Sequence, residues 1–141
     1  MKKLKIIICM VGLLPLIAAC TEPGDQGTLP RKIQGVTDTE ILIGSSLALG
    51  GHASYLGTQT LHGALSYLNH FNAQGGAYGR RVKLIAYDDG YDPPRCLANT
   101  QKLIVQDQVF ALFCYVGTPT TAKIIPLVEK AEIPLVGMFT G

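Results

Sequence analysis

Three short segments carry uncharged hydrogen-bonding groups that could hold a small molecule without reacting with it. They are residues 49–58, 115–121 and 139–141. The candidate binding residues within them are Tyr55, Val116, Gly117, Thr118, Phe139 and Thr140. Thr118 stands before a proline, so we expect it to cap a helix whose first N–H groups form a cradle for a carboxylate. Helix capping alone would explain any one of these threonines, but three such segments together favour a site for a small polar or zwitterionic solute.

Patterns for catalysis or metal binding are weak. His62 and His70 are eight residues apart, which is no metal-ligand spacing on a helix. Ser45 lies inside an apolar run and not at a strand-to-helix turn, so it is no nucleophile elbow. Asp88 and Asp89 resemble the acidic pair of a phosphoacceptor domain, but we expect them to cap the turn that follows. We therefore expect no enzyme, no metal and no cofactor; a secreted α/β hydrolase lobe would need a nucleophile and a base.

Alternating strands and helices are needed to bring the three segments together. Four strands are predicted from apolar or alternating runs at 41–49, 81–87, 109–116 and 134–139. Three helices are predicted between them, with buried faces that include Leu61, Leu68, Cys96, Leu103, Ala122, Ile125, Val128 and Ala131. This β-α-β-α-β-α-β order predicts an open, doubly wound parallel sheet that binds its ligand at the carboxyl ends of the strands.

The N-terminus has the layout of a secretory signal. Three lysines within residues 2–5 precede an apolar stretch, 6–19, that is too short to span a bilayer. The stretch runs into Cys20 through Ile-Ala-Ala, which resembles a lipobox, the motif in which the cysteine is acylated. An ordinary signal peptide cleaved beside a cysteine is the alternative.

These features predict three parts of the chain. Residues 1–19 are expected to be a lipoprotein signal peptide, 20–37 a flexible tether rich in Pro and Gly, and 38–141 a folded domain. Acylation of Cys20 would hold that domain at a membrane surface, on the periplasmic or extracellular side.

The charge balance gives no reason to expect a nucleic acid partner. The chain has 12 Lys plus Arg and 10 Asp plus Glu, for a net charge of +2. Loss of the three lysines in the signal would leave 9 basic against 10 acidic residues, a net charge of −1. A nearly neutral chain has no basic footprint for phosphates.

Cys96 and Cys114 would be the thiols left in the folded domain. Both are predicted near the carboxyl edge of the sheet, so they could form a disulfide in an oxidising compartment. Two buried free thiols are the alternative.

The chain resembles the type I periplasmic binding proteins, and within them the leucine/isoleucine/valine-binding branch, the solute receptors of branched-chain amino acid ABC importers. The resemblance is carried by the N-A-x-G-G-x-x-G-R segment (72–80), by the Tyr-Asp-Asp turn (87–93), and by Gly117-Thr118 before a helix. It extends from residue 38 to residue 141.

The resemblance implies two α/β lobes that close on a ligand, the first of which binds the carboxylate and ammonium of an amino acid-like solute. By position it points to Gly117, Thr118 and Thr140, with Tyr55 or Leu56 against the ligand. It implies a membrane permease as partner, whereas a ligand-sensing module of a receptor or amide-responsive regulator is the alternative. Because the family's second lobe does not follow, we expect a truncated or split product that forms the sheet but binds weakly.

Overall fold

A parallel sheet forms the centre of the protein, whose computed structural model describes residues 32–139. Its strands are β1 (Glu40–Leu47), β2 (Arg81–Asp88), β3 (Ala111–Phe113) and β4 (Leu135–Val136). They lie in the order β2-β1-β3-β4, and every neighbouring pair is parallel. The helices α1 (Ser54–Ala73), α2 (Pro93–Val105) and α3 (Thr118–Ala131) alternate with the strands. The predicted doubly wound α/β sheet is confirmed.

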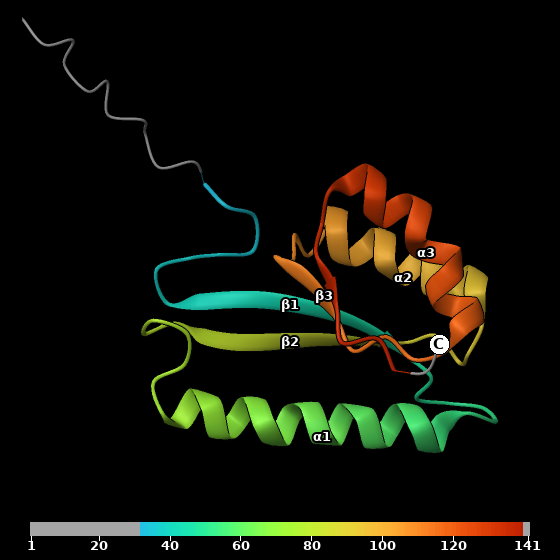
Figure 1. Ribbon diagram of the computed structural model, residues 1–141, viewed down its shortest axis with the longest axis horizontal. Helices are drawn as coiled ribbons and strands as arrows, with labels where there is room; N and C mark the ends of the chain where they lie inside the picture. Colours follow the sequence, from blue (N-terminus) through green and yellow to red (C-terminus); the bar gives the residue numbers. More distant parts are fainter. Residues whose placement is uncertain (1–31, 140–141) are drawn as a thin grey trace, which may run out of the picture. The chain divides into compact units, whose positions relative to one another are not determined.

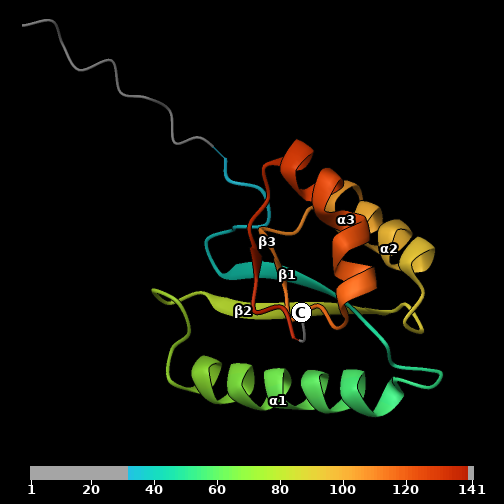
Figure 2. The same ribbon diagram turned by 45° about the vertical axis from the view of Figure 1, so that its right-hand side comes forward.

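The helices cover the two faces of the sheet unequally. In both ribbon views α1 lies on one side of β1 and β2, while α2 and α3 lie together on the other side (Figures 1 and 2). The main core lies on the α2–α3 side and contains the fully buried Leu103, Leu112, Tyr115 and Ile124. On the α1 side, Ile43, Leu68 and Ala111 form a smaller cluster.

The turn between α1 and β2 explains the N-A-x-G-G-x-x-G-R segment. Asn72 accepts a hydrogen bond from the backbone N–H of Val82 (2.8 Å) and donates one to its carbonyl (2.9 Å). Gly76 has φ +65°, and a Cβ there would lie 2.1 Å from the carbonyl oxygen of Arg80. The segment therefore closes a tight turn and fastens the end of α1 to the outer edge of β2.

Helix α2 begins as its sequence predicts. Asp92 is the N-cap, its carboxylate accepts a hydrogen bond from the backbone N–H of Arg95 (3.2 Å), and Pro93 is the first helical residue. Cys96, Thr100 and Leu103 are buried on its inner face, as the apolar spacing predicted.

The later elements differ from the prediction. The strands predicted at 109–116 and 134–139 are shorter, because Cys114 has φ +56° and ends β3; pairing resumes only as a bridge between Val116 and Phe139. The buried face of α3 is Thr120, Thr121, Ile124 and Val128. Ala122 and Ala131 are exposed, so that part of the prediction is wrong.

The folded unit begins before residue 38. The side chain of Gln34 donates hydrogen bonds to the carbonyls of Ile104 (3.2 Å) and Val109 (3.0 Å), and Gly35 accepts one from the N–H of Leu42 (2.8 Å). Residues 32–37, expected in the tether, thus contact the sheet, while the predicted signal peptide lies outside the described residues. Between residues 32 and 139, no helix has the length and apolar character to cross a membrane.

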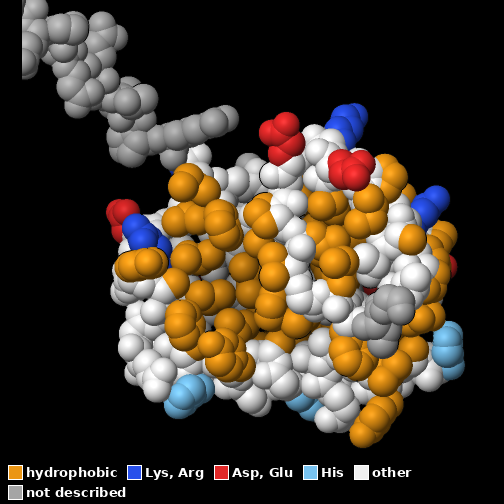
Figure 3. All heavy atoms as spheres, in the orientation of Figure 1, with side chains coloured by type: hydrophobic (Ala, Val, Ile, Leu, Met, Phe, Trp, Pro, Cys, Tyr) orange, Lys and Arg blue, Asp and Glu red, His pale blue; other side chains and the backbone are white. Residues whose placement is uncertain are grey.

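Apolar side chains also gather on the surface. Figure 3 shows them across much of the side of the molecule that is turned toward the viewer. In and after β4, Val136, Met138 and Phe139 are all exposed. The α1 side of the sheet therefore has less helical cover over β3 and β4 than over β1 and β2 (Figure 1).

Candidate functional site

The carboxyl ends of β1 and β3 are the place where this topology can hold a ligand. The chain leaves β1 for α1 on one face of the sheet, and it leaves β3 for α3 on the other face. A crevice is expected where neighbouring strands diverge in this way. The side chain of Ser45 in β1 donates a hydrogen bond to the carbonyl of Cys114, just after β3, at 3.4 Å.

The loop between β1 and α1, which lies at this edge, is short. Helix α1 begins at Ser54, so Tyr55 lies in its first turn and not in the loop where the sequence placed it. Tyr55 is 74% exposed and Leu56 is 40% exposed. A Cβ on Gly57 would lie 2.0 Å from the carbonyl oxygen of Ala48, so the helix starts pressed against the chain leaving β1.

Gly117, and not Thr118, caps α3. Gly117 is the N-cap with φ +102°, and no side chain makes a capping hydrogen bond, so the prediction that Thr118 caps the helix is wrong. Thr118 is instead an exposed residue of the first turn. Thr121 donates its N–H to the carbonyl of Gly117 (3.0 Å), whereas the described residues provide no acceptor for the N–H groups of Thr118 and Thr120.

Backbone pairing brings the chain after β4 beside this turn. The N–H of Gly117 donates to the carbonyl of Phe139 (3.2 Å), and the N–H of Phe139 donates to the carbonyl of Tyr115 (2.8 Å). Val116 is fully buried, and Phe139 is 44% exposed. Val116, Gly117, Thr118 and Phe139 therefore lie together, while Thr140 and Cys20 lie outside the described residues.

Asp88, at the end of β2, holds two loops together. Its Oδ1 accepts hydrogen bonds from the backbone N–H groups of Leu49 (2.8 Å), Gly50 (3.0 Å) and Gly90 (2.9 Å), and its Oδ2 lies 3.2 Å from the guanidinium of Arg95. Burial acts to raise the pKa of Asp88, but these N–H groups and Arg95 lower it more, and the net pKa is below its ordinary value. The expectation that this acid caps the loop is confirmed.

Asp89 is a buried acid with hydrogen bonds on both oxygens. It is 0% exposed, accepts a hydrogen bond from the hydroxyl of Ser46 (2.7 Å), and accepts another from the backbone N–H of Tyr91 (2.8 Å). It therefore ties the loop after β2 to the carboxyl end of β1.

Tyr91 also belongs to this edge, although no pattern in the sequence singled it out. Its ring packs edge-on against His52, with 5.3 Å between centroids and 76° between planes. A Cβ added to Gly117 would lie 2.4 Å from Cε2 of Tyr91. Tyr91 thus meets both loops of the edge, and the sequence marks it only as an aromatic residue two positions after a strand-end acidic pair.

The possible disulfide is absent from the structure, where Cys96 and Cys114 are both free thiols. Cys96 of α2 belongs to the main hydrophobic core. Burial, together with the nearby Asp89, raises its pKa to about 12. Cys114 is half-buried, and burial raises its pKa as well. The alternative of two free thiols is the one that the structure contains.

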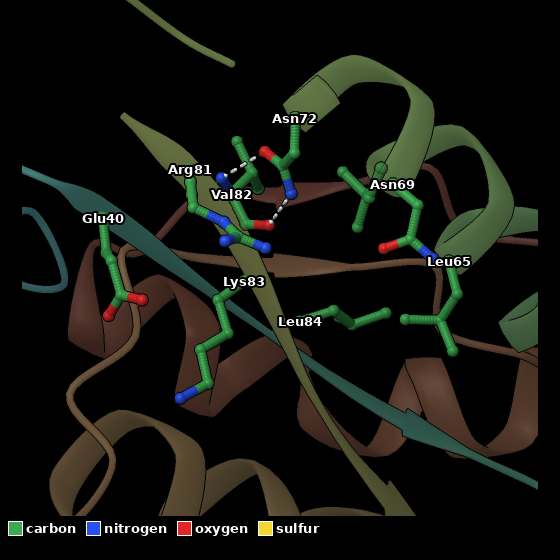
Figure 4. Close-up of a pocket in the computed structure, with 9 residues that line it drawn as sticks. Glu40, Leu65, Asn69, Asn72, Arg81, Val82, Lys83 and Leu84 are labelled. Atoms are coloured by element: carbon green, nitrogen blue, oxygen red, sulfur yellow. Dashed lines mark hydrogen bonds between the residues drawn. The ribbon is translucent and has the colours of Figure 1, made fainter. Parts of the chain in front are cut away.

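Three surface cavities lie away from this edge. One, of about 380 Å³, lies between α1 and the outer edge of β2, where Asn72 is turned toward the backbone of Val82 (Figure 4). The other two lie near the amino ends of the strands, at the end of the sheet opposite the carboxyl ends. They are lined mainly by residues of 32–37, 107–110 and 131–134. The candidate site is therefore an open rim formed by loops.

Comparisons with known proteins agree with this fold. A sequence profile described as periplasmic binding protein matches residues 40–141. A curated "Amino acid binding protein" of Pseudomonas aeruginosa is 34% identical over 84 residues, which are 60% of this chain and 22% of that protein.

Solved structures give the same result. A possible leucine/isoleucine/valine-binding protein from Rhodopirellula baltica is similar with a TM-score of 0.70 and 35% identity, over 77% of this chain and 29% of that one. The branched-chain amino acid transporter substrate binding protein LivJ from Streptococcus pneumoniae, solved with isoleucine, is similar with a TM-score of 0.64 and 26% identity, over 70% and 28%. The chain spans less than a third of the length of these relatives. Fold, profile and relatives agree, and the chain belongs to the periplasmic binding protein family.

Proposed function

We propose that this chain forms the N-terminal lobe of an extracytoplasmic solute-binding protein that serves an ABC importer. Its ligand is a branched-chain amino acid or a related small polar solute. The printed names of the relatives from Rhodopirellula baltica and Streptococcus pneumoniae support this ligand class. Recognition takes place at the carboxyl edge of the sheet and involves no chemical conversion of the ligand.

The observation that carries the proposal is the first turn of α3. Thr118, an exposed residue, has an N–H group with no acceptor in the described part of the chain, and its hydroxyl lies beside that group. The N-terminus of a helix carries a partial positive charge, so a carboxylate is favoured there.

Other residues of the rim complete the proposed site. Phe139 lies beside Gly117 through backbone pairing, so Thr140, the next residue in the sequence, is proposed as a second hydroxyl for the ligand. The strong exposure of Tyr55 leaves its ring free to contact the solute from the first turn of α1.

The proposed partner is the membrane permease of the importer, and the proposed anchor is a lipid on Cys20. Membership of a periplasmic binding protein family supports a location outside the cytoplasm. Metabolic labelling with radioactive palmitate tests the anchor: the chain should take up label, and a Cys20→Ser variant should not. Equal labelling of both would remove Cys20 from the proposal.

Ligand binding is tested by titrating the ¹⁵N-labelled chain with isoleucine and following backbone amide signals by NMR. The amide signal of Thr118 should move most. A millimolar dissociation constant is expected, because a pocket normally buries about 70–90% of a small ligand and a single rim covers less. Amide signals that move only around the cavity between α1 and β2 would refute the assigned site.

A pair of threonine variants supplies the control. Thr118→Val removes a hydroxyl from the rim and should weaken isoleucine binding. Thr60→Val removes a hydroxyl that donates only to the carbonyl of Leu56 on α1 and should leave binding unchanged. An absence of any response to isoleucine, leucine or valine at tens of millimolar would reject the proposed ligand class.

A further inference from the structure

We propose that Tyr91 is a positioning residue of the ligand site. Its ring, held between His52 and Gly117, sets the position of the loop after β1 relative to the first turn of α3. This inference rests on the proposed function, because the two segments that Tyr91 contacts are those proposed to hold the solute.

The contact with Gly117 is close and depends on the absence of a side chain. A Cβ at Gly117 would lie 2.4 Å from Cε2 and 2.9 Å from Cζ of Tyr91, and 3.0 Å from Oγ1 of Thr120. The ring of Tyr91 therefore occupies the space directly beside the N-cap of α3. Loss of the ring would leave that space empty and would allow the first turn of the helix to move.

On its other side the same ring contacts the first loop. His52 is an exposed residue of the β1–α1 loop, and its ring meets Tyr91 nearly at right angles, at 5.3 Å between centroids. Aromatic rings favour this edge-to-face geometry. One side chain therefore spans the gap between the two loops, and neither loop has to be held by the ligand alone.

The backbone of Tyr91 is held from the core of the protein. Tyr91 has φ +66°, a left-handed conformation that non-glycine residues adopt only with support from their surroundings. The support is the fully buried Asp89, which accepts the N–H of Tyr91 on one oxygen and the hydroxyl of Ser46 on the other. Asn99 of α2 donates to the same Ser46 hydroxyl at 3.2 Å. Because burying a carboxylate is costly unless it is hydrogen-bonded, this arrangement ties the position of Tyr91 to β1 and α2.

The sequence offers a matched control. Tyr78 is also a tyrosine with a positive φ (+52°) in a turn, but it is 99% exposed and lies between α1 and β2. Replacing it by alanine also removes a tyrosine ring at a position with positive φ, and leaves the ligand edge untouched.

The test compares isoleucine affinity in the full chain and in its Tyr91→Ala, Tyr91→Phe and Tyr78→Ala variants, by the NMR titration described above. Tyr91→Ala should weaken binding about three- to tenfold, as expected for loss of an aromatic contact. Tyr91→Phe keeps the ring and should bind as the wild type does, as should Tyr78→Ala. The Hα signals of Gly117, shifted by the Tyr91 ring, should move in Tyr91→Ala alone.

A second perturbation acts from the opposite side of the contact. Gly117→Ala places a methyl group where the ring lies and should also weaken binding. The double variant with Tyr91→Ala should lose less than the sum of the two single losses, because the ring that clashes is gone. Additive losses would show that the two residues act separately and would overturn the proposal.

The outcomes separate this role from the proposed function. A wild-type chain that does not respond to isoleucine overturns the proposed function and the role of Tyr91 with it. A wild-type response that Tyr91→Ala retains in full overturns the role of Tyr91 alone. If Tyr91→Ala does not fold, His52→Ala removes the exposed half of the same contact, and unchanged affinity in that variant likewise overturns the proposal.

Discussion

Replacing Asn72 by alanine should destabilise the protein through a defined pair of hydrogen bonds. The Asn72 side chain is bonded to both the N–H and the carbonyl of Val82, at 2.8 and 2.9 Å. A hydrogen bond contributes about 0.5–1.5 kcal/mol net, so the loss of two should cost about 2 kcal/mol. Val82 is only half-buried, and water can reach its freed backbone groups, so the larger penalty of a stranded buried group does not apply.

Asn69→Ala is the matched control. Asn69 lies nearly one turn earlier on α1, lines the same cavity as Asn72 and makes no hydrogen bond in the described part of the chain (Figure 4). Both variants gain the higher helix propensity of alanine, so the difference between them isolates the bonds to Val82. Urea unfolding followed by circular dichroism measures both.

The unfolding midpoint of Asn72→Ala should lie at a lower urea concentration than that of Asn69→Ala. The difference in urea concentration is expected to equal about 2 kcal/mol divided by the common m-value. A thermal scan should show the same order, with a difference of about 8–16 °C for a domain of this size. Equal midpoints for the two variants would refute the view that this side chain fastens α1 to the edge of the sheet.

Three further predictions test other features. Gly57→Ala should destabilise the protein by more than about 2 kcal/mol, because its Cβ would lie 2.0 Å from the carbonyl oxygen of Ala48. Gly63→Ala on the same helix meets nothing within 4 Å and should stabilise the protein by up to about 1 kcal/mol. Equal melting temperatures for the two variants would contradict this prediction. Because the pKa of Asp88 is lowered in the folded state, its ionised carboxylate stabilises the fold above the ordinary pKa of 3.8, and this stability is lost as pH falls through the lower pKa of the folded state. Asp88→Asn should therefore reduce the loss of unfolding free energy at acid pH. Parallel plots of unfolding free energy against pH for the wild type and the variant would argue against this. Because burial raises the pKa of Cys96 to about 12, iodoacetamide at pH 8 should label Cys114 before Cys96. Recovery of a disulfide-linked Cys96–Cys114 peptide after non-reducing digestion would disprove the free thiols.

The order and type of the elements could be read from the sequence because each has a strong local signal. The alternation of apolar runs with helical spacing predicts seven elements, and Asp92-Pro93 gives the start of α2. The buried face of α3 could not be read in this way. The side chain of Thr120 is polar, so its type does not indicate burial. It can be buried because its hydroxyl donates to the carbonyls of Val116 (2.7 Å) and Gly117 (2.9 Å).

The site was only partly predictable for a related reason. Gly117 and Thr118 were identified because they follow a strand, but which of them caps α3 depends on the positive φ of Gly117, which the pattern Thr-Pro does not reveal. Tyr91 was missed because its partners, His52 and Gly117, come from other loops. Contacts between loops far apart in the chain leave no periodic trace in the sequence.

The place of β1 in the sheet has a consequence for how the protein is synthesised. The ribosome makes β1 before β2 and β3, the strands that flank it. A nascent chain that stops short of Arg81 therefore exposes the apolar run from Ile41 to Leu47 with neither neighbour available. The sheet can close only after both crossovers have been translated, so during synthesis β1 waits longer for its neighbours than the strands that follow it.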